Sequence, residues 1–289
     1  MSASPVVVSP SWLALREEAD ARARSLELVR EVQRLLPPVG RIVIQDLGCG
    51  TGSMDRWLAP LLTGQQHWTL SDRDADLLAI AATRTPARSA DGAPVTVETR
   101  QRDITGLAPG ELAGSSLITT SALLDMLTAD ELDRFVAACA GAGCPVLVTL
   151  SVTGRVELQP ADPLDERIAA AFDAHQRRTV DGRRLLGPDA VGAAAAAFGR
   201  LGTEVVVRPS PWQLGVGQDT LPADLTAEWL AGWLAAAREQ EPDLAAVTAP
   251  YQQRRTAEAA DGRLSVTVHH RTCWPCHDER RCVDPQAAG

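Results

Sequence analysis

Three glycines follow a short apolar run and form the segment of the chain best suited to binding a cofactor. Residues 41–47 are rich in β-branched side chains and predict a strand, and helical spacing of apolar residues resumes soon after Gly48, Gly50 and Gly52. Glycines at such a turn let the backbone approach a ligand closely, while the following helix offers free N–H groups and positive potential. The turn therefore predicts a cofactor site.

The spacing of these glycines leaves two kinds of cofactor open. A dinucleotide-binding turn has the pattern Gly-x-Gly-x-x-Gly, and the last position of that pattern is Ser53 in this chain. An NAD-dependent oxidoreductase shares the strand–turn–helix arrangement and an acidic residue after the second strand. It remains an alternative interpretation of the turn.

The segment Asp-Leu-Gly-Cys-Gly-Thr-Gly, residues 46–52, resembles the nucleotide loop of class I S-adenosylmethionine-dependent methyltransferases. The resemblance continues along the chain. It implies that Asp72, after the second predicted strand, binds the ribose, and that Asp103 and Ile104, after the third, bind the adenine. Residues 119–125 are similar to the segment that borders the transferred methyl group. The implied cofactor is S-adenosyl-L-methionine, and the implied contacts are Asp46, Gly48, Cys49, Gly50, Gly52, Asp72, Arg73, Asp103, Ile104 and Ser121.

The elements that must position these residues alternate between strand and helix. This alternation predicts a mostly parallel sheet that is covered on both faces. The resemblance implies a doubly wound α/β fold with a seven-stranded sheet in the order 3-2-1-4-5-7-6. We expect an N-terminal helical lid (1–38), a Rossmann-like methyltransferase domain (39–208 and 263–272), a helical cap inserted before the last strand (209–262) and a disordered tail (273–289).

The implied activity is methyl transfer to an oxygen or nitrogen of a small molecule by in-line displacement. A hydroxyl or a protonated amine needs a base, for which Asp125 and His175 are the candidate catalytic residues. Arginines bind carboxylates through paired hydrogen bonds, and aromatic side chains favour apolar acceptors. Trp12, Arg16, Arg177 and Trp212 are the candidate substrate residues. A non-catalytic partner or sensor that binds the same cofactor is a further alternative.

Composition narrows the classes of partner. The chain has 289 residues, its 28 basic residues are all arginine, and its formal net charge is -9. This charge disfavours binding to nucleic acid or to an anionic membrane. We find no secretory signal pattern at the N-terminus and no apolar stretch of about 20 residues. We therefore expect a cytosolic protein with its six cysteines reduced.

A Cys-x-x-Cys-His string lies near the end of the chain, at residues 273–277. This spacing is that of c-type haem attachment, and Cys282 together with His269 or His270 could complete a zinc site. Haem attachment belongs to exported proteins, and a zinc site usually combines two such cysteine pairs. We therefore expect no metal and assign these cysteines to the tail.

Overall fold

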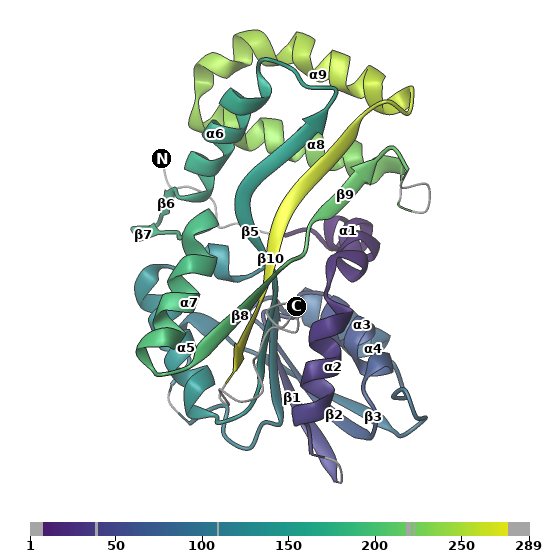
Figure 1. Ribbon diagram of the computed structural model, residues 1–289, viewed down its shortest axis with the longest axis vertical. Coiled ribbons are helices and arrows are strands. Elements are labelled where there is room, and N and C mark those ends of the chain that lie inside the picture. Colours follow the sequence, from purple (N-terminus) through teal and green to yellow (C-terminus); the bar gives the residue numbers. More distant parts are fainter. Residues whose placement is uncertain (1–7, 38–39, 109, 218–220, 222, 277–289) are drawn as a thin grey trace, which may run out of the picture.

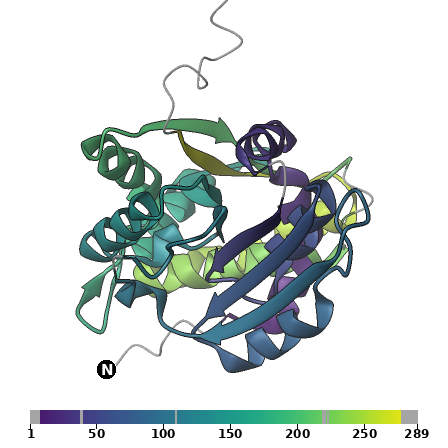
Figure 2. The same ribbon diagram turned by 90° about the horizontal axis from the view of Figure 1, so that it is seen from below.

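The computed structural model describes residues 8–37, 40–108, 110–217, 221 and 223–276. One sheet runs through the whole molecule, with helices on both of its faces (Figures 1 and 2). Its strands are β1 (Arg41–Leu47), β2 (Gln65–Asp72), β3 (Val95–Gln101), β4 (Leu117–Ser121), β5 (Val146–Gln159), β8 (Glu204–Pro209), β9 (Trp212–Gly215) and β10 (Ser265–Cys276). A separate hairpin joins β6 (Thr179–Val180) to β7 (Arg183–Arg184).

The helices occupy the connections between these strands. They are α1 (Pro10–Ala23), α2 (Leu26–Leu35), α3 (Ser53–Leu58), α4 (Ala75–Arg84), α5 (Ala129–Gly141), α6 (Asp165–Gln176), α7 (Ala190–Arg200), α8 (Ala223–Gln240) and α9 (Ala245–Ala260). Short 3₁₀ turns include η2 (Ile104–Gly106) and η3 (Leu124–Met126). None of the helices in the described part of the chain combines the length and the apolar character that a bilayer crossing requires.

The strand order confirms the predicted fold. The sheet runs β3-β2-β1-β4-β5-β10-β8, and the first five of these strands pair in parallel. β10 enters antiparallel between β5 and β8. With β8 as the sixth strand and β10 as the seventh, this is the order 3-2-1-4-5-7-6. The sheet has one strand more than predicted, because β9 also pairs with β10.

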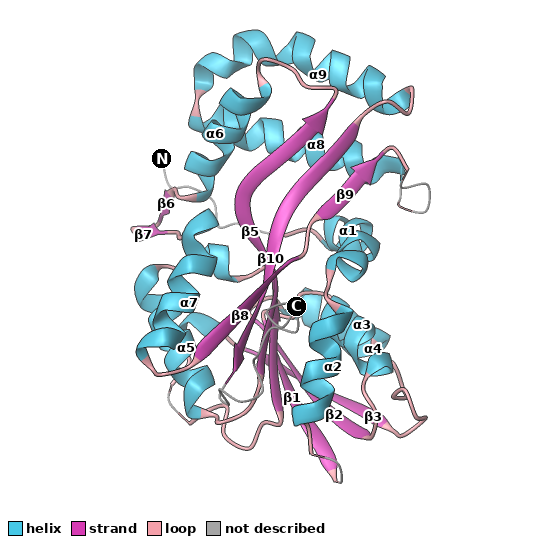
Figure 3. Ribbon diagram, viewed as in Figure 1, coloured by secondary structure: helices cyan, strands magenta, loops and turns pink. Residues whose placement is uncertain are grey.

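Two long strands extend the sheet beyond the part in which β1 to β5 pair in parallel, which we call the parallel half. β5 has 14 residues and β10 has 12, and their distal parts pair with each other and with β9 (Figure 3). Residues 152–159 continue β5 although they alternate polar and apolar side chains instead of forming an apolar run. The sequence analysis expected only helix in 209–262, where the short strand β9 precedes α8 and α9.

Three hydrophobic clusters hold these layers together. On one face of the parallel half, Ile44 and Trp68 pack with α2, α3 and α4. On the other face, Ile118 packs with α5 and α7. Around the distal strands, Trp233 and Tyr251 pack with α6, α8 and α9. We call this last part the distal half.

The predicted tail began too early. Residues 273–276 belong to β10, where Cys273 lies in one core cluster of the parallel half and Trp274 in the other. Alternate side chains of a strand point to opposite faces, so two consecutive buried residues fit a strand that is covered on both sides. Residues 277–289 lie outside the described residues.

The N-terminal helical region consists of two helices with a break at Arg24 and Ser25. Ser25 caps α2 by accepting a hydrogen bond from the Leu28 N–H. α1 lies between the distal half and the parallel half, beside β9, whereas α2 packs against the parallel half (Figure 1). The break therefore lets consecutive helices contact different parts of the molecule.

Candidate active site

The glycine turn lies between β1 and α3 and is fixed by the neighbouring strand. The backbone N–H groups of Gly48 and Cys49 donate to the Ser71 carbonyl at 2.8 and 3.0 Å. Gly48 has φ +69°, and a Cβ at this position would lie 2.9 Å from Leu123 Cδ1. Gly52 has φ +81°, and its Cβ would lie 2.6 Å from Asp55 Oδ1. Both positions thus combine a left-handed backbone with a close approach, which explains the glycines.

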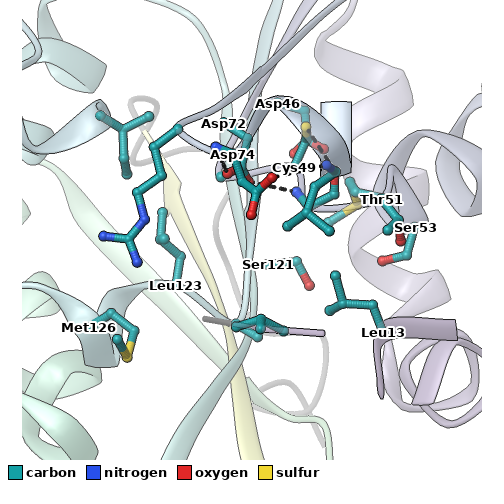
Figure 4. A pocket seen from close by; sticks show the side chains of 18 of the residues that line it. Leu13, Asp46, Cys49, Thr51, Ser53, Asp72, Asp74, Ser121, Leu123 and Met126 are labelled. Atoms are coloured by element: carbon teal, nitrogen blue, oxygen red, sulfur yellow. Dashed lines mark hydrogen bonds between the residues drawn. The ribbon is translucent and has the colours of Figure 1, made fainter. Parts of the chain in front are cut away.

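Asp72, at the end of β2, connects the turn to the second strand. Its Oδ2 accepts from the Gly50 N–H at 2.9 Å, and its Oδ1 accepts from the Asp74 N–H at 3.0 Å. Figure 4 shows Asp72 and Asp74 beside the turn, at the edge of the cavity. The carboxylate is thus oriented by backbone donors on both sides.

A cavity of about 660 Å³ opens in front of this turn. The ends of β1, β2 and β4, the residues after β3, and helix α1 contribute to its lining. Nine of the ten predicted cofactor residues line it: Asp46, Gly48, Cys49, Gly50, Asp72, Arg73, Asp103, Ile104 and Ser121. The tenth, Gly52, is the N-cap of α3 and is not among the lining residues.

Asp46 is the most deeply buried acid of the lining, with 1% of its surface exposed. Its Oδ1 accepts from Thr119 Oγ1 at 2.7 Å, whereas its buried Oδ2 has no hydrogen-bond partner among the described residues. Burial raises the pKa of Asp46 to about 7, and the hydrogen bond from Thr119 opposes this shift. A buried acceptor without a partner at the edge of a cavity fits a ligand that donates an N–H or O–H there.

The predicted adenine-binding residues follow β3. Asp103 accepts from the Thr105 N–H and hydroxyl at 2.9 and 2.8 Å, and so begins η2. Ile104 is buried next to it and also faces the cavity. The two side chains thus offer a carboxylate and an apolar surface side by side.

Helix α1 forms the wall opposite the strands. Leu13, Arg16 and Asp20 line the cavity from this helix, and Figure 4 shows Leu13 across from Leu123. Arg24, which directly follows α1, is buried and donates to Ser53 Oγ at 2.9 Å and to Ser121 Oγ at 3.2 Å. Because Ser53 and Ser121 both line the cavity, Arg24 connects α1 to two elements of the site.

The two candidate catalytic residues lie outside the lining of this cavity. Asp125 is half-buried on η3, next to the lining residue Met126. Burial raises the pKa of Asp125, against the opposing effect of Arg16 and Arg178. His175, on α6, pairs through Nε2 with Glu239 at 3.2 Å and through Nδ1 with Arg178 at 3.2 Å. Burial lowers the pKa of His175, as does Arg178, while Glu239 opposes both.

Of the candidate substrate residues, the structure brings only Arg16 to the cavity lining. Trp212 is buried between Trp12 and His270, and its Nε1 donates to Asp20 at 3.1 Å. Arg177 instead makes a two-point ion pair with Asp189, at 2.7 and 2.8 Å, in a separate groove. The indole of Trp212 therefore packs behind the cavity wall instead of forming it.

The sequence analysis missed several residues of the lining. Some are neighbours of the motif residues, and their closeness in sequence was a usable signal. Others come from α1, η3 or the β6–β7 hairpin, and nothing near the motifs marks them. The missed residues are Val8, Leu13, Asp20, Thr51, Ser53, Met54, Asp74, Leu77, Arg102, Thr105, Ala122, Leu123, Met126, Leu127 and Arg183.

Four cysteines are buried free thiols: Cys49, Cys139, Cys144 and Cys273. Burial raises the pKa of Cys273 to about 12, so its thiol stays protonated at neutral pH. The described residues contain no group of three or more potential metal ligands. His277 and Cys282 lie outside them.

Comparison with known proteins agrees with this geometry. Residues 44–143 match a family model described as a methyltransferase domain. The matched segment runs from β1 through α5 and so includes the glycine turn and the three acids Asp46, Asp72 and Asp103. No curated protein matches the chain.

Several solved structures are distantly similar. YjhP from E. coli has 18% identity over 92% of this chain and 99% of its own, with a TM-score of 0.42. A methyltransferase from Geobacter sulfurreducens, solved with S-adenosyl-L-homocysteine, has 16% identity over 93% of this chain and 100% of its own, at 0.41. A similar complex from Thiobacillus denitrificans has 17% identity over 92% and 99%, at 0.44.

The strand order and the turn after β1 define a nucleotide-binding α/β fold, and the family match specifies its class. The matched segment, residues 44–143, has the sequence of a methyltransferase domain, which supports the predicted class I S-adenosylmethionine-dependent methyltransferase and its cofactor S-adenosyl-L-methionine. The residues of the cavity fit that cofactor. The unpartnered oxygen of Asp46 can accept from a ligand amine, and Asp72 and Asp103 offer carboxylates at the ends of successive strands.

Proposed function

We propose that the protein methylates an oxygen or nitrogen atom of a small molecule bound against α1. The observation that carries this proposal is that one cavity joins the acids of the strand ends to an apolar wall. Leu13 on α1 faces Leu123 and Met126 across it, with Ser121 between them (Figure 4). A nucleotide-like ligand over the turn and an acceptor against the apolar wall would thus share one enclosed space.

The residues of the strand ends would hold the cofactor. We assign the ribose to Asp72, the adenine to Asp103 and Ile104, and the amino-acid end to the turn and to Asp46. When bound, S-adenosylmethionine supplies a methyl group that its sulfonium has already activated. The protein then has to align the acceptor with that group and exclude water, and alignment alone supplies a large part of the barrier reduction in favourable systems.

An acceptor that carries a proton needs a group to receive it. Asp125 is our first candidate, because it lies next to cavity-lining residues and burial raises its pKa. His175 is the second, although Glu239 and Arg178 engage both of its ring nitrogens. An acceptor that arrives as an anion needs neither residue.

A small acceptor fits the charge and enclosure of the site better than a macromolecule does. The net charge of -9 opposes association with a nucleic acid backbone. α1 covers the acceptor end of the cavity, so a base or side chain of a macromolecule would have to displace it. We also propose a cytosolic location, since the cysteines of the described part are free thiols.

Transfer of a labelled methyl group tests this function. The protein is incubated with S-adenosylmethionine labelled in its methyl group and with three fractions of an extract of the source cells: small molecules, nucleic acids and proteins. We expect label only in the small-molecule fraction, and loss of that label with Asp72→Ala. Label transferred to nucleic acid or protein would contradict the proposal.

A further inference from the structure

Arg16 is held rigidly at the cavity wall by two neighbours. Its Nε and Nη2 donate to Asp20 at 2.9 and 3.2 Å, and both side chains are largely buried. Asp20 also accepts from Trp212 Nε1, and the guanidinium carbon of Arg16 lies 5.0 Å from the centre of the Trp212 ring. Ion pairing and stacking on the indole together fix the orientation of the guanidinium.

This arrangement leaves one edge of the guanidinium free. A guanidinium carries five N–H groups, and Asp20 takes those of the edge formed by Nε and Nη2. No acceptor in the described part of the chain bonds to the edge formed by Nη1 and the second N–H of Nη2. Arg16 lines the cavity, so these parallel N–H groups are available to a ligand there. Two parallel N–H groups match the two oxygens of a carboxylate.

The charges near Arg16 favour an anion. Arg24 is the second guanidinium at this end of the cavity; burial lowers its pKa, and the charge of Arg16 adds to this effect. Asp20 is the one acid that pairs with Arg16, and burial leaves Asp46 only partly ionised at neutral pH, with a pKa of about 7. Asp125 also interacts with Arg16, and Glu17 with Arg24, but burial raises the pKa of Asp125 and Glu17 is paired with Arg56. A bound carboxylate would therefore add negative charge beside the two arginines.

Arg16 faces the acceptor side of the cavity. Arg24, not Arg16, donates to Ser53 and Ser121 beside the glycine turn. Besides Arg16, the lining contains apolar side chains from the same helix, Leu13, and from the segment after β4, Ala122, Leu123, Met126 and Leu127. A ligand that fills this part of the cavity therefore meets an apolar surface with one fixed guanidinium.

We propose that the free edge of Arg16 binds a carboxylate of the acceptor, so that the substrates of this enzyme are apolar molecules bearing a carboxylate group. This inference rests on the proposed function. It assigns Arg16 to acceptor recognition, and it gives Asp20 and Trp212 the task of positioning the guanidinium.

Calorimetry with matched ligands tests the proposal. The full chain is saturated with S-adenosylhomocysteine and titrated with two pairs of probes, octanoate with octanamide and 3-phenylpropionate with 3-phenylpropanamide. We expect at least one acid to bind about tenfold or more tightly than its amide, and Arg16→Gln to abolish the difference. Arg30→Gln, an exposed change on α2, should leave the preference intact.

Because Arg16→Gln leaves Asp20 buried without its cation, a double variant serves as a second test. In Arg16→Gln combined with Asp20→Asn, both charges are removed and Trp212 keeps an acceptor. The same loss of preference is expected, with a thermal midpoint near that of the wild type. A preference that persists in the folded double variant would overturn the proposal.

Three further results have defined meanings. If neither acid binds better than its amide to the wild type, the proposal fails. If Arg16→Gln weakens S-adenosylhomocysteine but not S-adenosyl-3-thiopropylamine, which lacks the carboxylate, Arg16 binds the cofactor and the acceptor proposal again fails. Failure of the proposed function itself is seen separately, as the absence of labelled methyl transfer to small molecules by the wild type.

Discussion

At the scale of single residues, the carboxylate of Asp72 contributes to the site in two ways. Its carboxylate accepts from the Gly50 N–H on one side and from the Asp74 N–H on the other. The same carboxylate faces the cavity at the end of β2, where the ribose of the cofactor is expected. In the proposed function, one side chain therefore both shapes the turn and binds the ribose.

Removing this carboxylate should weaken cofactor binding. We expect Asp72→Ala to reduce the affinity for S-adenosylhomocysteine by about 1–3 kcal/mol, because buried hydrogen bonds to the ribose and to the turn are lost. Isothermal titration calorimetry measures this loss. Asp76→Ala, an exposed change four residues further on, is the matched control. An unchanged affinity in Asp72→Ala would contradict the assignment of the ribose to this residue.

The raised pKa of Asp46 has a consequence for stability. In the unfolded chain this carboxyl ionises near pH 4, whereas in the folded chain it ionises at about 7. Between these values only the unfolded state loses its proton, so the free energy of unfolding falls as pH rises from about 4 to about 7. Below about pH 4 the carboxyl is protonated in both states, so this loss of stability does not occur.

Asp46→Asn should remove that part of the pH dependence, because the amide does not titrate and its oxygen can still accept from Thr119. We expect the free energy of unfolding of the variant, relative to that of the wild type, to be about 3 kcal/mol higher at pH 8 than at pH 5. Urea unfolding at the two pH values measures it. Asp55, whose pKa burial raises to about 6, contributes equally to both proteins. Glu228→Gln, on the exposed face of α8, should show no such gain.

At the scale of elements, α1 is the part of the molecule that closes the site. Glu17 on this helix accepts from Arg56 Nε and Nη2 at 2.6 and 2.8 Å, which joins α1 to α3. Arg24 adds its bonds to Ser53 and Ser121. The helix is thus attached by charged groups to the element that follows the glycine turn, and it presents Leu13 and Arg16 to the cavity.

Arg24→Met should weaken this attachment. Arg24 is 3% exposed, and its replacement leaves Ser53 and Ser121 without their donor. We expect a loss of about 2–4 kcal/mol in the free energy of unfolding together with weaker binding of S-adenosylhomocysteine. Chemical denaturation and calorimetry measure the two effects. Arg30→Met changes an exposed residue and should stay within about 0.5 kcal/mol of the wild type. A stable Arg24→Met protein with normal affinity would show that the attachment is unimportant.

At the scale of the whole molecule, the parallel half and the distal half share two strands. Val148 of β5 lies in a core cluster of the parallel half, whereas Leu158 of the same strand lies in the distal cluster. β10 contributes to all three clusters in the same way. Because neither half can lose these strands without disturbing the other, we expect the two halves to unfold together.

A core substitution in the distal half tests this coupling. Leu234 on α8 is fully buried, and Leu234→Ala should cost about 2–5 kcal/mol. Differential scanning calorimetry should show a single transition, moved as a whole to lower temperature. Val247→Ala, at a more exposed position of α9, should leave it almost unchanged. Two transitions, with only one displaced by Leu234→Ala, would show that the halves are independent.

The sequence by itself predicted the order of the strands, which the structure confirmed, and a cofactor site at the glycine turn. Gly48 and Gly52 need a left-handed backbone that few other residues adopt, and Asp46 and Asp72 directly follow or end apolar runs. These signals are local in the sequence. The fold then brings such residues together, because parallel strands end at the same edge of the sheet. The predicted class, fold and cofactor were confirmed for this reason.

Only the tertiary structure decided what forms the other wall of the site. Trp212 was a candidate for the substrate pocket by residue type, yet it packs behind Arg16, and Arg24 is the residue that fastens α1 to α3 and β4. Leu13 and Asp20 gave no signal at all. Their positions depend on how a helix packs against strands distant in sequence, and the energy of such packing is spread over many weak contacts that no local pattern records.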